Sequence, residues 1–184
     1  DFELRLPIGY SLKQLGEAES RGQSQASLYS SAFMYFILII IGLVMALNSF
    51  REAGLILSVA FLSIGLSFLG LFVGQQNYGF IGTISAIGLI GLSINDSIIV
   101  LSHIKEEADK KSLTKAELIE VVIRSTRHII TTSLTTLGGF VPLIFASVFF
   151  KPLAWAMSIG VLGATITALL YIPAMFMIMR KVKY

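Results

Sequence analysis

The chain has 184 residues, of which 55% are apolar and only 14% are charged. A soluble domain with so little charge would not stay dispersed in water, so most of the chain is predicted to lie in lipid. The lack of cysteine excludes disulfides, thiolate metal sites and cysteine nucleophiles, and the net charge of +3 comes without the aromatic and basic surface of a nucleic-acid binder.

The first thirty residues are predicted to lie outside the membrane. Residues 2–6 alternate between apolar and charged side chains, as a strand does, and Pro7 ends this pattern before a segment rich in Ser and Gln. We interpret residues 1–30 as the tail of an external soluble domain together with the helix that leads into the first span.

Five apolar runs are long enough to cross a bilayer. A bilayer core requires about 20 apolar residues in a helix, and a helix satisfies its own backbone hydrogen bonds in lipid. The runs cover roughly residues 31–50, 53–73, 79–102, 129–150 and 152–179. They predict an all-α bundle of five transmembrane helices within residues 31–184.

Basic residues concentrate on one side of these predicted spans. The larger group contains Arg51, Lys105, Lys110, Lys111, Lys115, Arg124, Arg127, Arg180, Lys181 and Lys183, and the smaller group contains Arg5, Lys13, Arg21 and Lys151. Because basic loops stay on the cytoplasmic side, we expect the C-terminal end to be cytoplasmic and the N-terminal end to be external.

The polar stretch between the third and fourth spans carries a helix signal. Thr114 and Glu117 have the spacing of a capping box, and apolar residues follow on one helical face. We predict an amphipathic helix over about residues 112–127 that lies along the cytoplasmic membrane surface. An ordinary solvated connector helix is the alternative.

Small residues are frequent within the spans. Glycine lets helices approach closely in lipid, where burial of apolar surface does not drive association. The glycines that we assign to helix packing are Gly88, Gly91, Gly138, Gly139, Gly160 and Gly163.

Asp96 is the single formally charged side chain well inside one of the apolar runs. An ionised carboxylate there costs about 2.5 to 3.5 kcal/mol, so its presence calls for a physical reason. Burial disfavours the charged form, which suits a group that must both bind and release a proton. The structural alternative is an Asp held by hydrogen bonds to Ser93, Asn95, Ser97 or a hydroxyl of another span.

Hydroxyl side chains lie at a depth comparable to that of Asp96 in the cytoplasmic half of the fourth span. They are Thr131, Thr132, Ser133, Thr135 and Thr136. They can relay a proton near Asp96 or bond back to carbonyls of their own helix. His103 and His128 fall at the membrane boundary, where an amphipathic ring is stable without a chemical role.

Two long motifs resemble the efflux permeases of the resistance-nodulation-division (RND) type, in particular the acriflavine-resistance group. These motifs are residues 91–100 (GLSINDSIIV) and 127–143 (RHIITTSLTTLGGFVPL). Residues 150–154 (FKPLA) and the glycines and proline that follow are similar to the final helix of that family, and residues 16–19 (GEAE) are similar to the segment where its external domain rejoins the membrane.

The resemblance implies a proton-driven exporter of small molecules in the bacterial inner membrane, with no enzymatic reaction, metal or cofactor. Such permeases are homotrimers with twelve spans per subunit, of which this chain would carry the last five. The implied partners are the lipid bilayer, the N-terminal half of the same transporter, a periplasmic adaptor and an outer-membrane channel, and no nucleic acid.

The family pattern is not fully reproduced around Asp96. Where the family has a lysine that faces acidic residues of the first half, this sequence has Asn95, with Asp96 beside it. Thr132 matches the family's relay threonine. The predicted proton relay therefore combines Asp96, singled out by its isolated charge, with Asn95 at the family's lysine position and Thr132 at its relay position.

Two other functions remain open from the sequence. Residues 93–97 (SINDS) and 132–136 (TSLTT) are also similar to the protein-translocation pair SecD and SecF of the same superfamily. A membrane anchor or sensing domain, in which Asp96 is only structural, is the other alternative.

Overall fold

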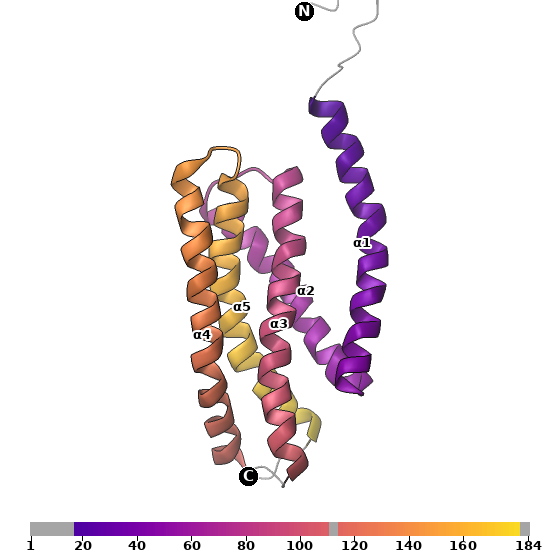
Figure 1. The fold of residues 1–184 in the computed structure, drawn as a ribbon, viewed down its shortest axis with the longest axis vertical. Helices are drawn as coiled ribbons and strands as arrows, with labels where there is room; N and C mark the ends of the chain where they lie inside the picture. Colours follow the sequence, from indigo (N-terminus) through magenta and orange to yellow (C-terminus); the bar gives the residue numbers. More distant parts are fainter. Residues whose placement is uncertain (1–16, 111–113, 181–184) are drawn as a thin grey trace, which may run out of the picture. The chain divides into compact units, whose positions relative to one another are not determined.

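The computed structural model describes residues 17–110 and 114–180, and every regular element within them is a helix (Figure 1). The helices are α1 (Glu17–Leu47), α2 (Phe50–Val73), α3 (Phe80–Lys110), α4 (Lys115–Ala146) and α5 (Lys151–Arg180). The predicted strand over residues 2–6 lies outside the described residues. The chain divides into one compact unit up to Ile39 and a second from Ile40 onward, which contains the last turns of α1 and all of α2–α5.

Each of the five helices contains a segment that is long and apolar enough to cross a membrane. These segments are Ser30–Leu47, Phe50–Val73, Phe80–Asp109, Ala116–Ala146 and Lys151–Met179. The predicted all-α fold with five membrane-spanning helices is therefore confirmed.

The region between the third and fourth spans differs from the prediction. Of the separate surface helix predicted over residues 112–127, residues 112–113 lie outside the described residues and residues 115–127 form the first part of α4, which continues without a break to Ala146. The physical reason is that no glycine or proline interrupts residues 115–137, so nothing ends the helix at the membrane boundary. The helix begins where the sequence indicates, because the Glu117 carboxylate accepts hydrogen bonds from the Thr114 N–H (2.9 Å) and hydroxyl (3.0 Å).

The second unit is held together by small-residue contacts and a buried apolar cluster. Helices α2, α3 and α5 pack on one another, and α4 packs on α3 and α5 (Figure 1). Leu89 of α3 lies in a cluster with Met157, Val161 and Ala164 of α5. This cluster fixes α3 against α5 and so determines which face of α3 is left to meet α4.

A tight turn joins α1 to the start of α2. Asn48, between α1 and α2, has a φ of 49°, a left-handed conformation that asparagine adopts more readily than most residues. Ser49 then caps α2, because its hydroxyl accepts a hydrogen bond from the Glu52 N–H at 3.4 Å. The chain thus reverses direction over two residues, and the end of α1 stays next to the first turn of α2.

Candidate functional site

Asp96 lies in the middle of α3 with only 7% of its surface exposed. Within the described residues, its carboxylate forms neither a hydrogen bond nor an ion pair. Ser93 donates to the carbonyl of Ile90 in its own helix, the buried Ser97 hydroxyl has no hydrogen-bond partner among the described residues, and Asn95 is exposed. The hydrogen bonds expected for a purely structural Asp96 are thus not made by these neighbours.

Two histidines belong to the same face of the bundle as Asp96. His128 of α4 acts electrostatically on the Asp96 carboxylate. His103, about two turns beyond Asp96 on α3 and thus on a similar face, forms a 2.8 Å hydrogen bond with the hydroxyl of Ser125 on α4. No partner for either ring was predicted from the sequence. The structure joins the His103 ring to α4 through Ser125, and both histidines are exposed.

The hydroxyl groups of α4 are bonded within their own helix. Thr132 donates to the carbonyl of Ile129 at 2.8 Å, with His128 O at 3.4 Å. The same back-bonding occurs at Thr131, Thr135 and Thr136, and at Ser133. Ser133 also contacts the Thr165 hydroxyl of α5 at 2.5 Å. Asp96 and Thr132 therefore share the α3–α4 side of the bundle without a hydrogen bond between them.

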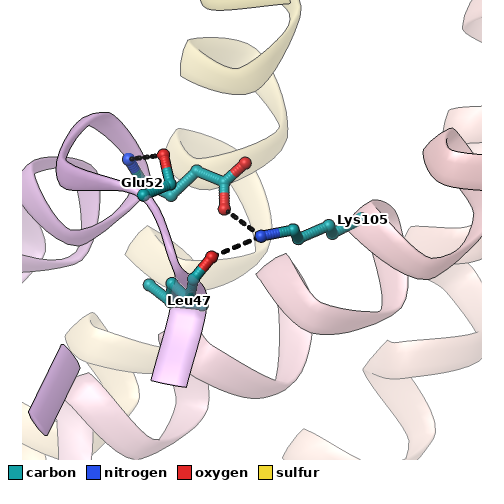
Figure 2. Close-up of polar contacts among 4 residues, drawn as sticks. Leu47, Glu52 and Lys105 are labelled. Carbon is teal, nitrogen blue, oxygen red and sulfur yellow. Dashed lines mark hydrogen bonds and ion pairs between the residues drawn. The ribbon is translucent and has the colours of Figure 1, made fainter. Parts of the chain in front are cut away.

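A second charged site was not identified from the sequence. Glu52 of α2 is 5% exposed and forms an ion pair with Lys105 of α3, with 2.9 Å between Glu52 Oε2 and Lys105 Nζ (Figure 2). Lys105 also donates a hydrogen bond to the carbonyl of Leu47, the last residue of α1. The available signal was a Glu in the first turn of an apolar helix, directly after Arg51, but position 52 fell outside the predicted span.

The glycines assigned to helix packing fall into two groups. A Cβ atom at Gly88, Gly160 or Gly163 would come within 2.8 Å, 2.3 Å and 2.6 Å of Met157, Leu89 and Leu66, respectively. At Gly91, Gly138 and Gly139 nothing among the described residues lies within 4 Å of that position. Gly70, which was not in the predicted set, makes the closest backbone approach, to Trp155 and Ala156 of α5.

The described residues contain no group of three or more His, Asp or Glu side chains placed to hold an ion, and the chain has no cysteine. On the α3–α4 side of the bundle, Asp96 supplies a carboxyl group that can bind and release protons, near an imidazole.

Three curated proteins are similar to this chain. The nickel and cobalt resistance protein CnrA of Cupriavidus metallidurans is 25% identical over 183 residues, which cover 97% of this chain. The nickel-cobalt-cadmium resistance protein NccA of Alcaligenes xylosoxydans xylosoxydans is 24% identical over 186 residues, or 98% of this chain. The swarming motility protein SwrC of Bacillus subtilis is 24% identical over 162 residues, or 85% of this chain.

The chain spans a small part of the length of these relatives, namely 17% of CnrA, 17% of NccA and 15% of SwrC. The model of the AcrB/AcrD/AcrF family matches residues 2–180. This match covers most of the segment before α1, all five helices and both motifs that resemble RND permeases. The chain therefore belongs to the AcrB/AcrD/AcrF family.

Proposed function

We propose that this chain forms the last five spans of a proton-driven RND exporter in the bacterial inner membrane and contributes a proton-binding group. The observation that carries the proposal is Asp96, a buried carboxyl group in the middle of α3 whose described neighbours leave it without a hydrogen bond. Ionisable residues inside a membrane span are costly and mostly functional. A carboxyl group with no structural partner is well suited to change its charge.

The response to protonation follows from where Asp96 lies. A proton that crosses about 100 mV gains roughly 2.3 kcal/mol, and this energy acts on the protein only through a group that changes charge within the field. Neutralising Asp96 would end its attraction to His128 and remove a buried charge next to α4. Of the four helices α2–α5, α4 has the smallest buried share of its span, so it is the helix least held by packing. We propose that α4 shifts relative to α3 when Asp96 is protonated.

Asn95 and Thr132 have secondary roles in this proposal. Asn95 carries no charge that could compensate Asp96. Because it is exposed on α3, it would contact other parts of the full-length transporter. Thr132 keeps its hydroxyl on the carbonyls of Ile129 and His128. Through these hydrogen bonds, Thr132 would position the backbone of α4 next to His128.

The exported substrate is proposed from the relatives alone. Two of the three are named for resistance to nickel and cobalt, one of them also to cadmium. Divalent metal cations are therefore the first substrates to test, followed by small organic compounds. A homotrimer that works with a periplasmic adaptor and an outer-membrane channel completes the proposal. The comparisons give no additional support to protein translocation.

The test replaces Asp96 in the full-length protein that carries this chain. Reconstituted vesicles with an imposed pH gradient would report transport of Ni²⁺ and of ethidium, each with an internal pH dye. We expect Asp96→Asn to abolish or strongly weaken proton-dependent export while the size-exclusion profile stays normal, and Asp96→Glu to retain part of the activity. Glu120→Gln, the same chemical change at an exposed carboxylate of α4, is the matched control. Full-rate, proton-dependent export by the Asp96→Asn protein would rule out the carrier role.

A further inference from the structure

Lys105 and Glu52 join three helices at one point (Figure 2). The Lys105 ammonium group donates both to the Glu52 carboxylate of α2 and to the Leu47 carbonyl at the end of α1. The last carbonyls of a helix lack partners within the helix, so this bond satisfies an acceptor that would otherwise be open. We call these three residues the clasp.

The charges of the clasp match the helix termini where they lie. Glu52 is in the first turn of α2, where the helix dipole favours an anion, and the Lys105 ammonium group is at the C-terminal end of α1, where it favours a cation. The left-handed Asn48 and the capping Ser49 keep the two helix ends adjacent. The backbone of the α1–α2 turn thus positions the two acceptors of the clasp, Glu52 and the Leu47 carbonyl, independently of α3.

The first turn of α2 borders a cavity next to α5. The cavity measures about 210 Å³ and is lined by the capping Ser49, by Arg51 and Glu52 of α2, and by Phe176 and Met179 of α5. Near the opposite end of α2, the backbones at Gly70 and Ala156 are in close contact. The first turn of α2 thus borders this cavity and carries the polar contacts of the clasp, while Ala53, Leu55 and Ile56 just beyond it are buried.

The clasp and the proton-binding site lie on different sides of α3. Lys105 is about two and a half helical turns beyond Asp96, so the two side chains leave the helix on roughly opposite faces. His103 leaves α3 toward Ser125 of α4, and Lys105 leaves it toward α1 and α2. One side of α3 is thus held by a partly buried ion pair, and the other carries Asp96 and His103, of which His103 bonds to α4.

We propose that Glu52 and Lys105 are positioning residues of the transport cycle, which hold α3 to the α1–α2 turn so that protonation of Asp96 moves α4 instead of α3. This inference rests on the proposed function, because it assigns the moving partner of the Asp96 site. The clasp stays closed throughout the cycle. Without the clasp, α3 would move together with α4, and protonation of Asp96 would produce less movement between the two helices.

The test uses the full-length protein, in a cysteine-free background, with Ni²⁺ and ethidium as transported probes. We expect Lys105→Met to lower the maximal export rate about tenfold or more with the apparent KM unchanged, since it removes the ammonium group that ties α3 to the buried Glu52 and to Leu47. Lys105→Arg keeps the charge and several donors, and we expect a rate within about twofold of the wild type. The exposed pair Glu120 and Arg124 of α4, 3.9 Å apart, provides the control variant Arg124→Met.

Replacing the Glu52–Lys105 ion pair by a covalent cross-link distinguishes two roles for it. A cross-link can substitute for a fixed attachment between α2 and α3, but not for a charge that must move during transport. We expect the double variant Glu52→Cys/Lys105→Cys to lose export, and a short bismaleimide that bridges the two thiols to restore it. A bridged protein that stays inactive, or a Lys105→Met protein with wild-type rates, would overturn the positioning role. If Asp96→Asn exports normally while the bridge still restores the double variant, the tie stands and only the proton site proposed at Asp96 fails.

Discussion

The contact between α2 and α5 at Gly70 allows a quantitative prediction. A Cβ atom at position 70 would lie 2.7 Å from the Ala156 Cα atom, 2.7 Å from the Trp155 carbonyl oxygen and 3.0 Å from the Ala156 carbonyl oxygen. Carbon atoms pack best at about 3.5 to 4.0 Å, so Gly70→Ala must push the two backbones apart by about 1 Å. No side-chain rotation relieves the clash, because all three atoms belong to the backbone.

The expected cost follows from two opposing terms. Overpacking of a close contact destabilises a protein by about 1 to 3 kcal/mol. Replacing glycine by alanine within a helix returns roughly 0.5 to 1 kcal/mol. The difference between the two terms is centred at about 1.2 kcal/mol, so we expect Gly70→Ala to destabilise the α2–α5 contact by about that amount, a factor of roughly 8 in the population of locally opened molecules.

Amide hydrogen exchange in the full-length protein measures this population helix by helix. We expect exchange in α2 and α5 to accelerate by that factor in Gly70→Ala. Gly65→Ala is the matched control, because it lies on the same helix with nothing within 4 Å of its Cβ position. It should leave exchange unchanged or slow it slightly. Equal exchange rates in the Gly70→Ala protein and the wild type would show that the two backbones are not in contact.

Three further predictions concern packing, the relay and topology. Gly160→Ala should accelerate amide exchange in α3 and α5, because the added Cβ atom would lie 2.3 Å from the Leu89 side chain. Adding Leu89→Val should reverse much of this effect, and a double variant without such relief would contradict the contact. Thr132→Val should lower export by a smaller factor than Asp96→Asn, because only a back-bonded hydroxyl is removed, and export assays with an equal or larger loss would argue for a direct proton relay. Glu120 and Val148 are both exposed. A single cysteine at position 120 should react with a membrane-impermeant maleimide only from the cytoplasmic side, and one at position 148 only from the external side. The reverse pattern would show that the topology is inverted.

Much of the architecture was predictable from the sequence because its causes are local. A run of about 20 apolar residues must form a helix in lipid, since no other structure satisfies its backbone there. This reasoning identified the five spans, and the spacing of Thr114 and Glu117 identified the start of α4. The isolated charge of Asp96 was visible for the same reason. The separate surface helix predicted over residues 112–127 is not confirmed, because α4 runs from Lys115 to Ala146 and polarity alone does not end a helix where residues 115–137 contain no glycine or proline.

The pairing of side chains between helices was decided by the tertiary structure. Whether a glycine meets another helix depends on the rotation and crossing of both, which is why Gly160 touches Leu89 while Gly138 faces no described neighbour. The link between Asp96 and His128 likewise depends on how α4 lies along α3. Glu52 resembled an ordinary residue at a helix start until the turn at Asn48 and the approach of Lys105 buried it in an ion pair. The sequence sets which groups are costly to bury, and only the packing of helices from distant parts of the chain determines which of them are compensated.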